Sequence, residues 1–119
     1  MTMIAGEEQG RVLVSVVVIG RNEGERLRVC LASIQRTDRT GFEIELIYVD
    51  SGSTDGSVAL AAGMGARTIA LDAERPSAAL GRNAGWRTAR GSFILFLDGD
   101  TVLHERFVCL LYTSDAADE

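Results

Sequence analysis

The chain has 119 residues, of which 46% are hydrophobic and 24% charged. This composition suits one globular domain with a buried core and excludes a disordered segment. The formal charge is −5, but Asp115, Asp118 and Glu119 supply three of the seventeen acids, so the rest of the chain carries fourteen acids against twelve arginines. That near balance argues against a nucleic-acid partner. The two cysteines are too few for a disulfide framework or a metal cluster.

The two ends of the chain differ in character from the middle. Residues 1–10 are polar and unpatterned, which predicts a flexible leader; they lack the pattern of a signal peptide, so we expect a cytoplasmic protein. Residues 109–119 resemble the translation of a sequencing adapter read through in frame, and we expect a non-native tail there rather than a genuine C-terminal segment. The predicted domain therefore spans residues 11–108.

The first predicted elements are a buried strand at residues 12–19 and an amphipathic helix after it. Valine and isoleucine run almost unbroken through the strand, which stops just before Asn22 and Glu23. Apolar residues then recur at helical spacing, while arginines and glutamates take the opposite face. The apolar positions are Leu27, Cys30, Leu31 and Ile34. Cys30 is accordingly expected in the core.

A second strand, helix and short third strand follow. Residues 44–49 are apolar and end at Asp50, and the turn at residues 50–57 is rich in residue types that cap helices. The next helix begins near Val58 and ends at the glycines of residues 63–65. Residues 67–71 predict the third strand.

The last helix and strand lead into two closely spaced carboxylates. Pro76 and Ser77 open a helix expected to carry Leu80, Ala84 and Arg87 and to close at Gly91. The unbroken apolar run at residues 93–97 predicts a parallel strand buried on both faces. It ends at Asp98-Gly99-Asp100, where we expect the glycine to let the backbone turn so that both carboxylates face one site. A hard divalent cation would offset their repulsion, although an ordinary acidic turn has the same composition.

The alternation of strands and helices predicts an α/β fold, a Rossmann-like parallel sheet with right-handed crossover helices. We expect the strand order 3-2-1-4, which places a topological switch between the first and last strands. Ligands of such sheets bind beyond the carboxyl ends of the strands. Asn22, Asp50 and Asp98 all follow strand ends, so they should converge on one edge.

Four segments carry a resemblance to a known family. They are Val-Ser-Val-Val-Val-Ile-Gly-Arg-Asn-Glu from residue 14, Val-Asp-Ser-Gly-Ser-Thr-Asp-Gly-Ser from residue 49, Gly-Arg-Asn-Ala-Gly from residue 81, and Phe-Leu-Asp-Gly-Asp from residue 96. In this order and spacing they resemble the inverting family-2 glycosyltransferases with a GT-A fold. The similarity covers nearly all of residues 12–108 and implies the N-terminal, nucleotide-sugar-binding half of a truncated enzyme.

The resemblance implies roles for particular residues. Asp50 resembles the acid that helps read the nucleotide base, Asp98 the residue near the ribose, and Asp100 the carboxylate that holds Mg²⁺ or Mn²⁺ on the diphosphate. Arg82 and Asn83 resemble the Arg-Asn pair before the last strand, where a guanidinium suits phosphate or ribose contacts.

Two positions depart from the family pattern and affect the base contacts. Many relatives carry a second aspartate where this chain has Ser51, and an aromatic or small residue where it has Arg21. Asn22 and Glu23 line the nucleotide pocket in one interpretation and cap the first helix in the other. Both interpretations stay open from the sequence.

The implied partners are a nucleotide-diphosphate sugar, with a UDP-sugar favoured, and an acceptor saccharide or lipid carrier. In the family the catalytic base lies after the metal motif, so no base is named here, although His104 is the one imidazole of the chain. We therefore expect the chain as written to bind a donor without turning it over. Membrane association of a full-length protein is compatible with this assignment.

Two alternatives accompany this assignment. Apolar residues followed by Asp98-Gly99-Asp100 also match the motif of haloacid-dehalogenase phosphatases, in which the first aspartate attacks phosphorus. That motif normally lies on the first strand and needs a lysine, whereas here it comes last and the chain has no lysine. The second alternative is an inactive nucleotide-binding fragment.

Overall fold

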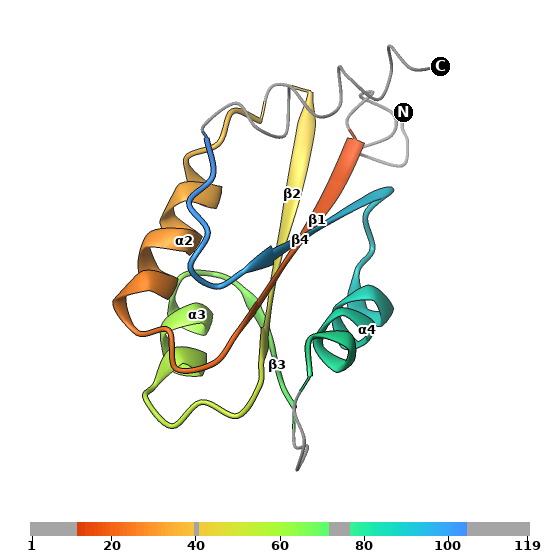
Figure 1. Cartoon of the computed structure of the whole chain (residues 1–119). Helices are drawn as coiled ribbons and strands as arrows, with labels where there is room; N and C mark the ends of the chain where they lie inside the picture. Colours follow the sequence, from red (N-terminus) through yellow and green to blue (C-terminus); the bar gives the residue numbers. More distant parts are fainter. Residues whose placement is uncertain (1–11, 40, 72–76, 105–119) are drawn as a thin grey trace.

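The computed structural model describes residues 12–39, 41–71 and 77–104, and it shows a parallel sheet with helices on both faces (Figure 1). The predicted leader at residues 1–10, the predicted tail at residues 109–119 and Pro76 lie outside the described residues.

All strand pairings within the sheet are parallel. The strands are β1 (Val12–Gly20), β2 (Phe42–Asp50), β3 (Arg67–Ala70) and β4 (Phe93–Asp98), and the helices are α2 (Glu25–Gln35), α3 (Ser57–Gly63) and α4 (Ala78–Thr88). The strand order is β3-β2-β1-β4, which confirms the predicted order.

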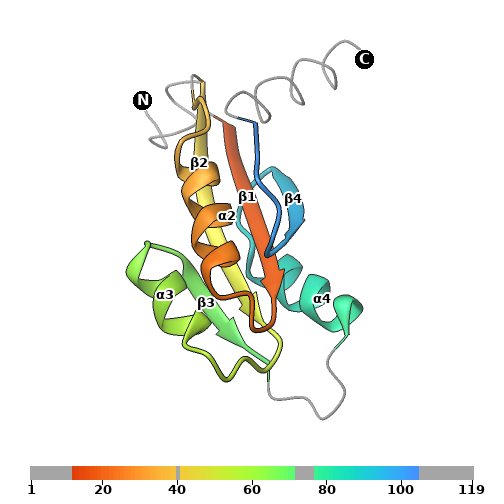
Figure 2. The same ribbon diagram turned by 60° about the vertical axis from the view of Figure 1, so that its left-hand side comes forward.

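The helices divide between the two faces of the sheet. Helices α2 and α3 cover one face and α4 covers the other (Figures 1 and 2). The chain moves outward from β1 to β2 to β3 and then returns across the sheet to β4, so a right-handed crossover must carry α4 to the opposite face. The direction of the connections therefore reverses between β1 and β4, the position at which α/β sheets bind ligands.

Helix α2 packs against the sheet through the apolar stripe that its sequence predicts. The four stripe residues are fully buried and form one core cluster with side chains of β1 and β2; they are Leu27, Cys30, Leu31 and Ile34. The polar positions Glu25, Arg26 and Arg28 are exposed. The amphipathic period therefore predicted both the helix and its buried face, and the core assignment of Cys30 is confirmed.

Helix α4 packs on the opposite face through glycines rather than through an apolar stripe. A Cβ atom at Gly81 would lie 2.8 Å from Ile19, and one at Gly85 would lie 2.3 Å from Val17. Of the residues that the sequence places on this helix, Ala84 packs against the core, whereas 44% of Leu80 is exposed. The helix also ends at Thr88, before Gly91. Its start is as predicted, since the Ser77 hydroxyl accepts a hydrogen bond from the Leu80 amide at 3.1 Å.

The prediction that β4 is buried on both faces is wrong for the part of the chain that the structure describes. None of its six residues is buried, and Phe93 and Phe96 are 39% and 36% exposed. Among the described strands, β4 pairs only with β1 and forms an edge of the sheet. A continuous apolar run therefore does not distinguish a central strand from an edge strand.

In the described parts of the chain, no helix combines the length and the apolar character needed to cross a lipid bilayer.

Candidate functional site

The polar clusters predicted to converge do lie at one edge of the sheet. In the strand register Gly20 of β1 lies beside Asp50 of β2, and Ile19 of β1 lies beside Asp98 of β4. Asp50 and Asp98 therefore flank the end of β1, and two strand spacings place their backbones about 10 Å apart across the sheet. This edge is also where the connections reverse direction, so it is the expected ligand-binding edge.

A pocket of about 270 Å³ lies at this edge between β1, β4 and α4. Its lining brings together two of the predicted site residues, Arg82 and Asp98, with an apolar floor. The lining residues are Ile19, Arg82, Phe96, Leu97, Asp98 and Thr101. Asn83, the neighbour of Arg82, is exposed on α4 and does not line the pocket. The pocket thus offers one cation and one carboxylate beside apolar surface.

The turn after β4 is fixed by backbone hydrogen bonds to the end of β1. The Gly99 amide donates to the Ile19 carbonyl at 2.9 Å, and the Thr101 amide donates to the Asp98 carbonyl at 3.0 Å. The chain turns at Gly99 as expected, but φ of this residue is not positive, so its backbone angles do not require glycine. A Cβ atom here would lie 2.9 Å from Cγ of Glu23, and glycine is needed because the loop after β1 approaches so closely.

The carboxylates of this turn fit a metal ion that is shared with a bound phosphate. Asp98 and Asp100 are both exposed, and Asp100 lies outside the lining of the pocket. Among the described residues no group of three or more histidine, cysteine or acidic side chains could hold a metal. Mg²⁺ and similar ions are typically held by one or two carboxylates with substrate phosphates completing the shell. The described residues therefore do not form a closed protein cage for a metal ion.

Helix α2 supports this turn from beneath, and the segment after β4 runs along the helix (Figures 1 and 2). The Cys30 thiol donates to the Asp98 carbonyl at 3.8 Å, and the buried Ser33 hydroxyl accepts from the Leu103 amide at 2.9 Å. Burial raises the pKa of Cys30 to about 11, and the negative charge of Asp100 adds to the shift. The thiol is therefore protonated at neutral pH and acts as a packing group.

Asp50 lies at the same edge, but its carboxylate is turned inward. The residue is 2% exposed, and four donors bind its two oxygens. Oδ1 accepts from the Tyr48 hydroxyl at 2.7 Å and from the Ser53 hydroxyl at 2.5 Å. Oδ2 accepts from the amides of Gly52 at 3.1 Å and Ser53 at 2.7 Å. The carboxylate therefore shapes the turn that follows β2.

Asn22 joins the loop after β1 to the loop after β2. Its backbone amide donates a hydrogen bond to the Ser53 hydroxyl at 2.8 Å, and its side-chain Oδ1 accepts one from the backbone amide of Thr54 at 2.8 Å. The alternative in which Asn22 and Glu23 cap the first helix is wrong, because Gly24 is the N-cap and no side chain caps this end. Glu23 instead pairs with Arg26 at 3.0 Å.

Tyr48, Ser53 and Thr54 are the network residues that sequence reasoning missed. The polar residues of the turn at 50–57 suggested side-chain caps for the next helix. Ser53 instead donates a hydrogen bond to Asp50, and the Thr54 amide donates one to Asn22. The N-cap of α3 is Gly56, without a side-chain cap. One available signal was the period of β2, since Tyr48 and Asp50 stand two positions apart and so share a face of the strand.

The environment of Asp50 predicts a loss of stability in acid. Burial alone would raise the pKa of this carboxyl, but the hydrogen bonds from Ser53, Tyr48 and Gly52 outweigh it and leave the pKa below its ordinary value. A depressed native pKa contributes stability above the unfolded pKa of about 3.9, and this contribution is lost as the pH falls through the native pKa. In urea denaturation, the stability difference between the wild type and Asp50→Asn should therefore shrink as the pH falls from about 6 to about 3. A difference that stays constant with pH would contradict this expectation.

Comparison with known proteins assigns the chain to a family. The profile of "Glycosyl transferase family 2" matches residues 15–117. The chain is 28% identical to glycosyltransferase AglE of Haloferax volcanii over 99 residues, covering 80% of this chain and 33% of AglE. It is 31% identical over 104 residues to the poly(ribitol-phosphate) beta-N-acetylglucosaminyltransferase TarP of Staphylococcus aureus, covering 83% of this chain and 32% of TarP.

Solved structures agree in fold. Residues 1–349 of S. aureus TarS superpose with a TM-score of 0.70 at 25% identity, over 88% of this chain and 31% of that one. Glucosyl-3-phosphoglycerate synthase from Mycobacterium tuberculosis, in complex with Mn²⁺, UDP and glucosyl-3-phosphoglycerate, gives a TM-score of 0.71 at 28% identity. That match covers 92% of this chain and 40% of the synthase. The four-stranded sheet is thus the GT-A arrangement expected from the sequence.

The chain spans about a third of the length of the first of these curated relatives. The family profile, in contrast, covers most of the chain, including every described strand and helix except the start of β1. The chain therefore belongs to glycosyl transferase family 2.

Proposed function

We propose that this chain forms the donor-binding part of a metal-dependent glycosyltransferase, which transfers a sugar from a nucleoside diphosphate to an acceptor saccharide or lipid carrier. The observation that carries the proposal is the pocket at the carboxyl edge of β1 and β4, where Arg82 and Asp98 lie together beside the turn that bears Asp100. A cation, a carboxylate and an exposed second carboxylate at a topological switch suit a phosphorylated ribose with its counter-ion.

In this proposal the donor lies across the end of β1. Arg82, with Asn83 beside it on α4, faces the phosphate or ribose, and Asp98 faces the ribose from the wall of the pocket. The nucleotide base extends toward the loops after β1 and β2, which carry Asn22, Glu23 and Asp50. These two loops lie next to each other, on the side of β1 away from β4. A UDP donor is favoured, since two similar structures were solved with UDP or UDP-GlcNAc. A third similar structure was solved with GDP-Man, so guanosine is the alternative.

Asp100 is proposed to hold Mg²⁺ or Mn²⁺ together with the diphosphate. Two of the similar structures contain Mn²⁺, and the exposed carboxylates suit an ion that phosphate oxygens complete. When bound, such an ion supplies positive charge that stabilises the departing nucleoside diphosphate. Asp98 and Arg82 then orient the donor, beside the apolar side chains that line the same pocket.

The haloacid-dehalogenase alternative gives way to the family assignment. The glycosyltransferase profile covers the Asp98–Asp100 turn together with the strands and helices around it. Asp98 shares its pocket with an arginine, which suits binding of an anionic ligand.

Melting of the 119-residue chain tests the proposal. UDP and MnCl₂ together, at about 100 times the dissociation constant, should raise the melting temperature by more than about 10 °C. Either component alone should have little effect, because the described residues offer no group of three or more ligands that would hold the metal without the diphosphate. Asp100→Ala should abolish the joint effect. We expect no measurable glycosyl transfer by the chain itself, since none of its described residues is assigned as the base.

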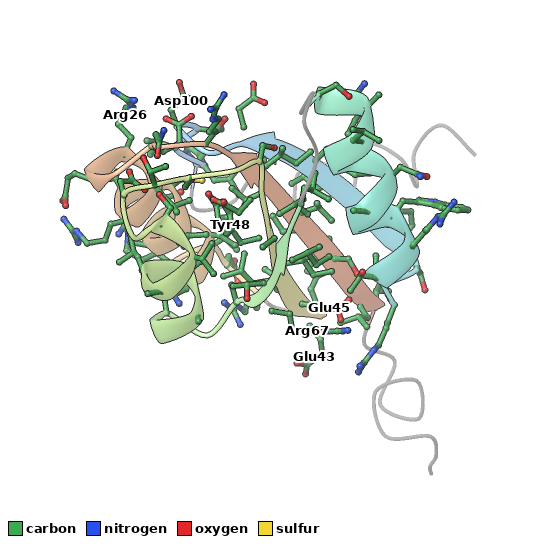
Figure 3. The ribbon with its side chains drawn as sticks, turned by 90° about the horizontal axis from the view of Figure 1, so that it is seen from below. Arg26, Glu43, Glu45, Tyr48, Arg67 and Asp100 are labelled. Atoms are coloured by element: carbon green, nitrogen blue, oxygen red, sulfur yellow. The ribbon has the colours of Figure 1, made fainter. Side chains whose placement is uncertain are left out.

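Glu43→Ala is the matched control, because it removes an exposed carboxylate that lies well away from Asp100 (Figure 3). It should leave the rise caused by UDP and MnCl₂ unchanged. A rise of the same size without metal would overturn the assignment of Asp100, and no rise under any condition would overturn donor binding. GDP in place of UDP tests the preference for uridine.

A further inference from the structure

We propose that Asp50 is a positioning residue: its carboxylate fixes the loops at residues 21–24 and 51–54 to each other, and the nucleotide is contacted by those loops rather than by this carboxylate. This inference rests on the proposed function, since it concerns the same donor site. It goes beyond that function because it separates the residue that holds the site in shape from the groups that touch the ligand.

The first argument is that the Asp50 carboxylate has no vacant acceptor position. A carboxylate offers about four lone-pair sites, and here four donors are in place: the hydroxyls of Tyr48 and Ser53 and the amides of Gly52 and Ser53. The residue is also 2% exposed. A nucleotide base could bind this carboxylate only by displacing one of these donors and leaving it buried without a partner, which is unfavourable.

The second argument is that the hydrogen bonds continue from Asp50 across both loops. The Ser53 hydroxyl donates a hydrogen bond to Asp50 and accepts one from the backbone amide of Asn22 at 2.8 Å. The side-chain Oδ1 of Asn22 in turn accepts a hydrogen bond from the backbone amide of Thr54 at 2.8 Å. The Ser51 amide donates to the Gly20 carbonyl at 2.9 Å, which closes the connection. One buried charge thus fixes both loops that line the base end of the site.

The backbone of Asn22 shows that these bonds hold the loop in an unusual conformation. Its φ is +52°, the only positive value among the non-glycine residues that the structure describes. The left-handed region is unfavourable for residues with a side chain, although asparagine tolerates it better than most. The contacts with Ser53 and Thr54 offset this cost, so loosening the Asp50 network should release Asn22.

Tyr48 allows the network to be weakened from beneath. Its side chain is fully buried, and its hydroxyl lies 3.4 Å from the position of a Cβ atom on Gly20, under the end of β1. Figure 3 shows it in the interior, apart from the exposed Asp100. A ligand at the surface cannot touch this hydroxyl, so any effect of its removal on binding must pass through Asp50 and the serines of the turn after β2.

The binding experiment compares Tyr48→Phe, Asp50→Asn and the double variant with the wild type. The dissociation constant of UDP is measured with excess MnCl₂ by calorimetry, at a temperature where every variant is fully folded. Each single variant should weaken binding by about tenfold, and the double variant should be no weaker than either, because both changes act on one network. If Tyr48→Phe binds UDP as the wild type does while Asp50→Asn binds weakly, the carboxylate touches the ligand and the proposal is overturned.

Ser15→Ala is the matched control for loss of a buried hydroxyl. Ser15 is fully buried and hydrogen-bonded, but it lies in β1 five residues before Gly20, about 16 Å from the site. It should lower the melting temperature and leave the dissociation constant unchanged. Equal weakening of UDP binding by Ser15→Ala would mean that binding reports general stability, which would also overturn the proposal.

Hydrogen exchange without nucleotide separates this inference from the proposed function. The amides of Ser53 and Thr54 should exchange at least about tenfold faster in Tyr48→Phe and Asp50→Asn than in the wild type or Ser15→Ala. If the wild type fails to bind UDP, the proposed function falls, but the exchange rates still show whether Asp50 holds the loops. If these amides exchange at the wild-type rate in both Tyr48→Phe and Asp50→Asn, the positioning role of Asp50 is overturned, whether or not the chain binds UDP.

Discussion

Replacing Gly85 by alanine is expected to lower the free energy of unfolding by about 2 kcal/mol. The added Cβ atom would lie 2.3 Å from Cγ1 of Val17, and Cγ2 and Cβ of that side chain would lie at 3.2 and 3.3 Å. Val17 is fully buried in the core under α4 and is stiff about its first side-chain bond. The helix must therefore move away from the sheet.

The expected loss is the difference between two opposing effects. Overpacking of a well-packed core costs about 3 kcal/mol, whereas alanine is favoured over glycine inside a helix by about 1 kcal/mol. Because the clash involves a β-branched side chain that cannot retreat, the first effect is the larger. Urea denaturation of the purified chain measures the net change.

Two other glycines provide an internal scale for this experiment. Gly63, at the end of α3, has no atom within 4 Å of the position that a Cβ would occupy, so Gly63→Ala should be neutral or slightly stabilising. Gly81→Ala should lie between the two, since its Cβ would be 2.8 Å from Ile19. Equal effects at Gly63 and Gly85 would show that helix propensity, and not close packing of α4 on β1, determines the result.

Replacing Glu45 by alanine is expected to cost about 3 kcal/mol of stability. Its side chain is 11% exposed and links β2 to β1, to β3 and to the segment after α4. Oε1 accepts from the hydroxyl of Ser15 at 2.7 Å and the amide of Arg90 at 2.9 Å, while Oε2 pairs with Arg67 at 2.8 Å. Figure 3 shows Glu45 and Arg67 side by side, well away from Asp100.

The cost comes mainly from the donors that the substitution leaves behind. Ser15 is fully buried, so its hydroxyl hydrogen would lose its partner away from water. Arg67 is 45% exposed and can be solvated, so its lost ion pair contributes little. The pKa of Glu45 agrees with this picture: burial alone would raise it, but the hydrogen bonds from Ser15, Arg90 and Arg67 leave it lowered.

A double-mutant cycle separates these contributions. Glu45→Ala should cost much less in a Ser15→Ala background than in the wild type, because the stranded hydroxyl is then absent. Glu45→Gln keeps an acceptor for Ser15 and should be milder than Glu45→Ala. Strict additivity of Ser15→Ala and Glu45→Ala would contradict the coupling that the hydrogen bond implies.

The order of elements could be predicted because it follows from local patterns, and the strand order was expected from the arrangement that places a topological switch between the first and last strands. Leu27, Cys30, Leu31 and Ile34 repeat at the period of a helix, and all four are buried against the sheet. Right-handed crossovers and the position of the ligand edge then follow from the alternation of strands and helices. The convergence of Asp50 and Asp98 beside the end of β1 is a consequence of that topology.

Features that depend on contacts between distant residues could not be predicted in the same way. The face that α4 presents to the sheet includes Gly81 and Gly85 beside Ala84, and glycines carry no hydrophobic signal, so the close approach of this helix could not be predicted. Gly99 is required by the approach of Glu23, which is 76 positions earlier in the chain, and not by its own backbone angles. The exposure of β4 likewise depends on which strands lie beside it.

The sequence by itself determined the family resemblance, the α/β class and the edge at which the site lies, because motifs and periodicity are set by neighbouring residues. The strand order was an expectation that the tertiary structure confirmed. Only the tertiary structure decided that Arg82 and Asp98 share a pocket and that Asp50 is turned inward. The physical reason is that a carboxylate can bind a ligand or bind its own chain. Which of these it does depends on donors such as Tyr48 and Ser53, whose positions are fixed only when strands and loops have packed together.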